Sequence, residues 1–132
     1  DRVTEALARH GLTRALVNIG EHRALGGPFR LGIEDTSAGF LGTLSLRNGA
    51  AATSSPGALL LPDGSAHILD PLEGRPPVWS SITVTAASAA LADGLSTALC
   101  HAPRDEIARI RARLGAGIGI RAVDPRGDLV TL

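Results

Sequence analysis

Hydrophobic residues recur every three to four positions in three segments of the chain, a spacing that buries one face of a helix. The first segment covers residues 1–10, and the second is the Ala- and Leu-rich stretch from Ser88 to Cys100. The third opens with Pro103, carries acidic residues in its first turn, where the helix dipole favours them, and runs to Leu114. The sequence therefore predicts three helices, one at the start of the chain and two in its second half.

Short apolar or alternating runs bounded by Gly, Pro and Asn predict strands between these helices. They are residues 15–19, 29–33, 43–47, 50–54, 58–61, 65–69, 80–85, 118–123 and 129–132. The strongest turn signal is Asn48-Gly49, which would take positive φ angles in a type I′ turn and predicts a hairpin between residues 43–47 and 50–54. Residues 124–127 predict a second hairpin near the end of the chain. Together these elements indicate one α+β domain, with an antiparallel sheet covered on one side by helices.

Composition excludes several classes of partner. The 132 residues suit a single domain, and 13 Arg balance 13 acidic residues with no Lys, so no net charge favours nucleic acid or an anionic membrane. Few aromatic residues are present to stack on bases, and no apolar run approaches the ~20 residues of a transmembrane helix. The single cysteine, Cys100, cannot form an internal disulfide and is expected to be a small core residue.

Two oxygen-bearing side chains lie four residues apart in the segment from Ser88 to Cys100. Asp93 and Thr97 are therefore expected to project from the same side of a helix. A carboxylate and a hydroxyl at this spacing can bind a hard cation such as Mg²⁺ or Ca²⁺, or cap a phosphate. The same spacing also fits a structural role, in which Asp93 caps the start of a helix and Thr97 bonds back to a carbonyl. Spacing alone leaves both interpretations open.

His67 lies in the predicted strand 65–69, and strand alternation places its side chain on the opposite face from Asp70. By itself His67 fits either a general base or a hydrogen-bonded structural residue. The other histidines do not have the spacing of zinc ligands, and no Gly-x-Ser-x-Gly elbow is present. The glycines at 115, 117 and 119 follow a predicted helix, which argues against a dinucleotide-binding loop, since that loop follows a strand.

Five short sequence blocks, spread over almost the whole chain, resemble blocks of one known family and occur in the same order as in that family. They are Ala15-Leu-Val-Asn-Ile-Gly20, Asn48-Gly-Ala-Ala-Ala-Thr-Ser54, His67-Ile-Leu-Asp-Pro71 with Gly74-Arg-Pro76, Ser81-Ile-Thr-Val-Thr85 and Ala92-Asp-Gly-Leu-Ser-Thr-Ala98. On these residues the chain resembles the ApbE family of FAD:protein FMN transferases. The resemblance implies a T-fold-like structure and magnesium-dependent cleavage of FAD, with FMN joined to a Ser or Thr of a client flavoprotein.

The resemblance also implies roles for individual residues. The family's D-x-x-x-T metal motif falls on Asp93 and Thr97, which would bind Mg²⁺. The His of its H-x-x-D-P block, implicated in flavin transfer, falls on His67, which would contact the flavin and take the proton from the acceptor hydroxyl. Thr53 and Ser54 match a segment that lines the flavin pocket and are the weaker candidates for binding it.

The chain departs from the family's pattern at two places. Gly20-Glu21-His22 stands where the family has Gly-Gly-Asp, and Pro71-Leu-Glu-Gly74 stands where it has Pro-Arg-Thr-Gly. Family members are also longer, and Asp1 matches the last residue of their Ala-Lys-Gly-x-x-x-Asp motif. The resemblance therefore implies that residues 1–132 are the C-terminal portion of an ApbE-like domain, and that a missing N-terminal half or a partner chain completes the FAD site.

Three functions are consistent with this resemblance. The first is transfer of FMN from FAD to a client Ser or Thr by the complete enzyme. The change at Gly20-Glu21-His22 motivates a second, a flavin-binding or flavin-delivering module without transfer activity. The third is an FAD pyrophosphatase, in which water replaces the client hydroxyl. The resemblance also favours a bacterial protein in an extracytoplasmic compartment, either periplasmic or anchored to a membrane.

Overall fold

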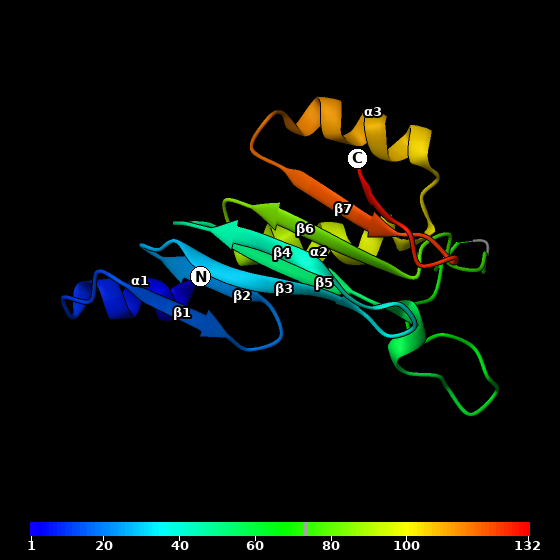
Figure 1. Ribbon diagram of the computed structural model, residues 1–132, viewed down its shortest axis with the longest axis horizontal. Coiled ribbons are helices and arrows are strands. Elements are labelled where there is room, and N and C mark those ends of the chain that lie inside the picture. The colour runs from blue at the N-terminus through cyan, green and yellow to red at the C-terminus, as the bar shows by residue number, and fades with distance from the viewer. Residues whose placement is uncertain (73) are drawn as a thin grey trace.

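The centre of the molecule is a six-stranded antiparallel sheet. The computed structural model describes residues 1–72 and 74–132, so Glu73, part of the departure at residues 71–74, lies outside the described residues. The strands follow the order β1-β2-β5-β6-β7-β8 across the sheet (Figure 1). Their bounds are β1 Ala15–Asn18, β2 His22–Leu25, β5 Ala50–Ser54, β6 Ser81–Ala86, β7 Gly119–Val123 and β8 Leu129–Thr131. The predicted α+β fold with an antiparallel sheet is confirmed.

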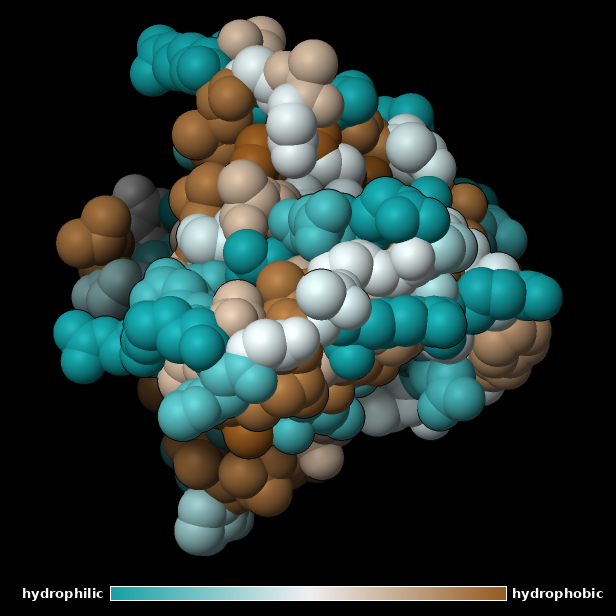
Figure 2. All heavy atoms as spheres, turned by 90° about the vertical axis from the view of Figure 1, so that its left-hand side faces the viewer, coloured by the Kyte–Doolittle hydropathy of each residue, from teal (hydrophilic) through white to brown (hydrophobic). Residues whose placement is uncertain are grey.

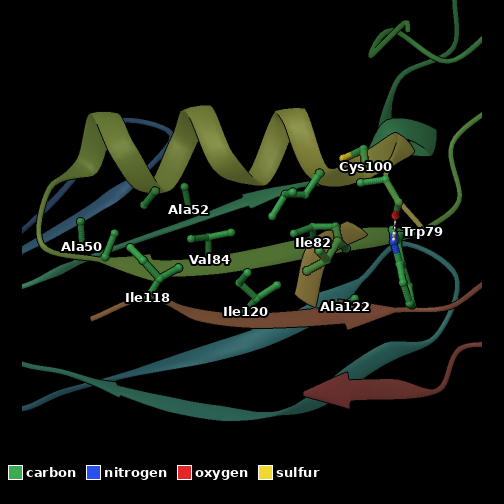
Figure 3. Packing of buried hydrophobic residues seen from close by; sticks show 14 of the residues in the cluster. Ala50, Ala52, Trp79, Ile82, Val84, Cys100, Ile118, Ile120 and Ala122 are labelled. Carbon is green, nitrogen blue, oxygen red and sulfur yellow. Dashed lines mark hydrogen bonds between the residues drawn. The ribbon is translucent and has the colours of Figure 1, made fainter. Parts of the chain in front are cut away.

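All three predicted helices are present, as α1 (Arg2–Arg9), α2 (Ala89–Ala98) and α3 (Arg104–Leu114). Helix α2 continues into a 3₁₀ turn, and it packs on β5 and β6. Figure 3 shows Ala52, Ile82 and Val84 between this helix and the strands. The residues that α2 buries here, Ala89, Ala92 and Ser96, have small side chains, so the helix backbone lies close to the sheet.

The opposite face of the sheet is covered by a two-stranded antiparallel ribbon, β3 (Phe29–Asp35) and β4 (Gly39–Leu46). Ile33, Leu44 and Leu46 of the ribbon are buried in one cluster with Ala24 and Ala51 of the sheet. Since successive side chains of a strand point to opposite faces, the neighbours of Ala51 in β5 belong to the helix side. Helices therefore cover one side of the sheet, as expected, and strands cover the other.

The predicted hairpin across Asn48-Gly49 is wrong. Strand β4 pairs with β3, whereas β5 pairs with β2 and β6 in the other sheet. Asn48 does have a positive φ of 49°, and its Oδ1 accepts a 2.6 Å hydrogen bond from the Gly26 amide. The turn signal thus marks the crossing from one sheet to the other. Almost all of β5 is buried on both faces, so it requires a layer above and below, which a simple hairpin does not provide.

The segment between β5 and β6 does not form the two strands predicted at residues 58–61 and 65–69. It contains a 3₁₀ turn at Pro56–Ala58 and a single isolated bridge between Leu60 and Ala66. Leu59 and Leu60 are 60% and 59% exposed, so no apolar layer holds this segment in extended pairing. In Figure 1 the segment projects from one end of the sheet.

A buried carboxylate joins the ribbon to the central sheet. Asp35, at the end of β3, is 4% exposed, and its Oδ1 accepts hydrogen bonds from the Ser37 hydroxyl and from the amides of Ser37 and Ala38. Its Oδ2 accepts bonds from the hydroxyls of Ser80 and Ser81, at 2.8 and 2.7 Å. Burial opposes the charged form, but these hydrogen bonds together hold the pKa of Asp35 well below its usual range.

Helix α1 lies against β1 and β2 at the edge of the sheet. Its buried residue is Thr4, whose hydroxyl donates to the Asp1 carbonyl at 2.6 Å, while Val3 is 46% exposed. Polar side chains cover much of the side of the molecule that includes α1 (Figure 2). None of the helices in the described ranges has the length and apolar character needed to span a membrane.

Candidate functional site

One cleft gathers all five residues that the sequence singled out, and its volume is about 500 Å³. Thr53 and Ser54 come from the end of β5, His67 comes from the segment that follows, and Asp93 and Thr97 come from α2. These parts of the chain meet because α2 packs on the face formed by β5 and β6. The fold therefore brings the expected metal pair, base and flavin-pocket residues around one space.

Asp93 and Thr97 occupy successive turns of α2 and are exposed in this cleft. The alternative in which Asp93 caps the helix is wrong, because the cap is Ser88, whose Oγ accepts a hydrogen bond from the Leu91 amide. The hydroxyl of Thr97 lies 3.1 Å from Oγ of Ser54, so it faces the end of β5. The positions of both side chains therefore favour a role in the cleft over a role in capping.

The hydroxyl of Ser54 connects β5 to α2. Ser54 is 7% exposed, and its Oγ lies 2.8 Å from Oγ of Ser96 as well as 3.1 Å from Oγ1 of Thr97. Ser96 in turn donates to the Asp93 carbonyl at 3.0 Å. Thr53 turns its hydroxyl toward Thr83 of β6, at 2.9 Å. Ser54 is thus linked directly to Thr97, whereas the hydroxyl of Thr53 is engaged within the sheet.

His67 is exposed, and it does not lie in a strand. Its Nδ1 is 3.1 Å from the carbonyl oxygens of both Pro56 and Leu59. A carbonyl only accepts, so Nδ1 must carry the proton in these contacts, and the neutral ring then presents Nε2 as an unprotonated acceptor. The surrounding segment therefore fixes the tautomer that a general base requires.

The oxygen donors of α2 are of the kind that suits a magnesium ion. Mg²⁺ is usually bound in proteins by one or two carboxylates together with water and substrate phosphates. Asp93 and Thr97 supply a carboxylate and a hydroxyl, and the described residues include no group of three His, Cys, Asp or Glu that could enclose a metal. This donor set suits a cation shared with a phosphate-bearing substrate.

A second cleft of about 540 Å³ adjoins the first, and both are lined by Ile68, Asp93 and Thr97. His101, in the 3₁₀ turn after α2, lines the second cleft, and within the described part of the chain neither of its buried ring nitrogens has a hydrogen-bond partner. His101 is one of the histidines whose spacing does not suit zinc, so the sequence assigned it no role. His101 follows Thr97 by four residues, as Thr97 follows Asp93, so the helical repeat was a signal in the sequence that could have placed all three side chains near one another.

Asp70 and Arg75 shape the wall of the second cleft. The Asp70 side chain is 5% exposed, and its Oδ2 accepts a 2.8 Å hydrogen bond from Nε of Arg75. Its Oδ1 accepts a bond from the Leu72 amide at 3.0 Å. Asp70, the carboxylate of the H-x-x-D-P block, thus has a structural function, because it fixes the turn that follows His67.

Cys100 is a core residue, as expected. It is fully buried, and its thiol donates to the Ser96 carbonyl at 3.2 Å. Burial raises the pKa of the thiol to about 12. The thiol is therefore protonated at neutral pH and is not a nucleophile of the site.

Comparison with known proteins places this geometry in a family. Residues 1–120 match the sequence profile of the ApbE family. A protein of Rhodobacter capsulatus named FAD:protein FMN transferase is 33% identical over 112 residues, which are 80% of this chain and 21% of the relative.

Solved structures agree. The crystal structure of the ApbE protein of Thermotoga maritima has a TM-score of 0.84 at 25% identity, over 99% of this chain and 47% of the other. The apo flavinyl transferase ApbE of Pseudomonas stutzeri has a TM-score of 0.76 at 29% identity, over 100% of this chain and 44% of the other. The chain thus spans less than half the length of these relatives. By the match over residues 1–120, and in agreement with its fold, it belongs to the ApbE family.

Proposed function

We propose that this chain provides part of the active site of an FAD:protein FMN transferase, which moves FMN from FAD to a Ser or Thr of a client flavoprotein with the help of Mg²⁺. The observation that carries the proposal is the convergence of His67, Asp93 and Thr97 on one cleft. A base and a pair of hard oxygen donors are the groups that phosphoryl transfer to a hydroxyl requires. The name of the Rhodobacter capsulatus relative supports the same chemistry.

In the proposed reaction, the acceptor hydroxyl oxygen forms a bond to the FMN phosphorus. The bond from this phosphorus to the bridging oxygen breaks, and AMP leaves with that oxygen. His67 takes the hydroxyl proton at Nε2, since its Nδ1 is engaged with two backbone carbonyls. Asp93 and Thr97 would hold Mg²⁺, which would neutralise pyrophosphate charge.

Thr53 and Ser54 line the same cleft, and we propose that this end of β5 forms the surface against which the flavin nucleotide binds. Ser54 is the stronger candidate for an effect on activity, because its hydroxyl contacts Thr97 directly. Thr53 is expected to contribute mainly to the shape of the cleft, because its hydroxyl is paired with that of Thr83.

We further propose that residues 1–132 are the C-terminal portion of the ApbE domain and that another part of the enzyme, or a partner chain, completes the FAD site. The proposal is supported by the coverage of 47% and 44% of the two solved relatives. The two-donor metal pair also calls for further ligands. Residues 1–132 alone should therefore bind FAD more weakly than the complete enzyme and should not turn over. Full turnover by the isolated segment would contradict this proposal.

The experiment that tests the function incubates the complete enzyme with FAD, Mg²⁺ and a client peptide, and follows peptide mass and released nucleotides. Transfer predicts a peptide that gains the mass of FMN through a phosphoester bond, together with one AMP for each labelled peptide. The control peptide has Ala in place of the acceptor Ser or Thr and should stay unlabelled. Free FMN and AMP without labelled peptide would instead indicate a pyrophosphatase, and bound intact FAD would indicate a flavin-delivering module.

A further inference from the structure

Asp1 lies beside the first turn of α2, although the two are 88 residues apart in the sequence. Its Oδ1 accepts a 2.9 Å hydrogen bond from the Ala89 amide, and its Oδ2 accepts a 3.3 Å bond from the Ala90 amide. The first amides of a helix have no partner within the helix. Ser88 satisfies the amide of Leu91, so the carboxylate of Asp1 completes a cap that the helix's own sequence supplies only in part.

The Asp1 carboxylate is itself held in place from the sheet. Nε of Arg23, in β2, donates to Oδ1 of Asp1 at 3.0 Å, and Nη1 of the same side chain donates to the carbonyls of Ala24 and Gly49 at 2.9 Å each. The Arg23 and Asp1 side chains are 23% and 29% exposed, so the ion pair is partly shielded from solvent. The start of α2 is therefore tied to β2 and to the residue before β5.

The packing of α2 makes its end contacts important for its position. The helix buries Ala89, Ala92 and Ser96 against the sheet, and such small side chains make fewer packing contacts than large ones. At its other end, Nε1 of Trp79 donates to the Ala102 carbonyl at 2.9 Å, and the Val78 amide donates to the Cys100 carbonyl (Figure 3 shows Trp79 and Cys100). Hydrogen bonds at both ends thus fix how far the helix lies along the sheet.

We propose that Asp1 is a positioning residue for the metal pair. By fixing the start of α2 it sets where Asp93 and Thr97 stand relative to His67, about one and two helical turns further along. This inference rests on the proposed function, because the position of α2 affects catalysis only if Asp93 and Thr97 bind Mg²⁺. Small displacements of catalytic groups have large effects on rate, so a contact outside the cleft can influence the reaction.

The test compares Asp1→Ala and Asp1→Asn with the control Glu5→Gln, all in the complete enzyme. Glu5 is an exposed carboxylate one turn further along α1. The measurement is the Mg²⁺ dissociation constant in the presence of FAD, on protein whose folding is verified by thermal unfolding. Asp1→Ala should raise this constant by about 10- to 100-fold, the usual effect of losing a residue that orients metal ligands. Glu5→Gln should leave it unchanged.

Asp1→Asn should give a Mg²⁺ dissociation constant between those of the native enzyme and Asp1→Ala. The Asn side-chain oxygen can still accept hydrogen bonds from the amides of α2, but the substitution removes the negative charge that pairs with Arg23. A lower unfolding temperature with an unchanged Mg²⁺ dissociation constant in the folded protein would overturn the proposal. If Asp1→Ala does not fold, the Mg²⁺ dissociation constant of folded Asp1→Asn is the test, and an unchanged constant overturns the proposal.

A native enzyme that does not bind Mg²⁺ would contradict the proposed function and leave the position of α2 to be tested by crystallography. Crystal structures of the native protein and of Asp1→Asn in the same crystal form then provide the comparison. A displaced α2 supports the role of Asp1 in positioning the helix, and an α2 in the native position overturns it.

Discussion

Oγ of Ser54 lies 3.1 Å from Oγ1 of Thr97, which joins the last residue of β5 to the helix that carries the metal pair. The contact orients the hydroxyl of Thr97 in the cleft that both residues line. A hydroxyl can accept from one partner while donating to another, so Thr97 can bind Ser54 and still offer a lone pair to a cation. Through this contact a buried strand residue can influence Thr97, which we propose as a metal ligand.

The metal pair is tested by Asp93→Ala and Thr97→Val in the complete enzyme. Asp93→Ala should abolish magnesium-dependent activity, and Thr97→Val should weaken Mg²⁺ binding less, because a charged oxygen contributes more to a hard cation than a neutral one. Calorimetric titration with Mg²⁺ and the rate of FMN transfer are the measurements. The free energy of unfolding should change little for Asp93→Ala, since this side chain is exposed. A loss of about 1 kcal/mol or more, with activity per folded molecule preserved, would indicate a structural carboxylate.

His67→Asn tests the base. Peptide labelling should fall by about 10²–10⁴-fold, the usual contribution of general-base catalysis, while FAD and Mg²⁺ still bind. Any hydrolysis of FAD by water that the native enzyme carries out without peptide is the internal control and should survive in the variant. Equal and small effects on labelling and hydrolysis would remove His67 from the mechanism.

Asp35 should make the stability of the fold sensitive to acid. Its pKa is held below the usual value in the folded state, so folding is favoured when the carboxylate is charged. This contribution is fully present above the unfolded pKa of about 3.9 and is lost as the pH falls from there toward the lower folded pKa. Urea unfolding of the native protein and Asp35→Asn at neutral and acidic pH measures it.

At neutral pH, Asp35→Asn should cost about 2 kcal/mol, because the hydrogen bonds of Ser37, Ser80 and Ser81 to a charged group are weakened. The difference between the two proteins should shrink in acid. Asp105→Asn, at an exposed ion pair of α3, is the matched control and should change stability little. A difference that stays constant across this pH range would show that the charge of Asp35 contributes nothing to stability.

The Cys100 thiol should be nearly inert toward thiol reagents in the folded protein. A pKa raised to about 12 lowers the thiolate fraction by about three orders of magnitude relative to a group with the ordinary value of 9.0. Labelling with an aromatic disulfide reagent at mildly alkaline pH should therefore be slow, and it should become rapid and stoichiometric in denaturant. Rapid labelling of the native protein would mean that the end of α2 opens readily.

Elements that depend on neighbouring residues could be predicted from the sequence. Helix α3 was expected from Pro103 and from acids in its first turn, and the final hairpin from the turn at residues 124–127, and both are confirmed. The D-x-x-x-T spacing placed Asp93 and Thr97 on one side of α2 because the helical repeat fixes that relation locally. The resemblance of separate blocks to one family added His67 and the end of β5.

Only the tertiary structure decided relations between distant residues. Nothing in the sequence of β4 indicates that it pairs with β3 in a separate ribbon, because alternation specifies a buried face and not the partner strand. Strand β2 was missed, since it buries little beyond Ala24. The cap that Asp1 provides to α2 spans 88 residues and depends on how the edge of the sheet folds against the helix. Spacing encodes short-range geometry, whereas long-range contacts follow from which packing buries the most apolar surface while satisfying every buried polar group.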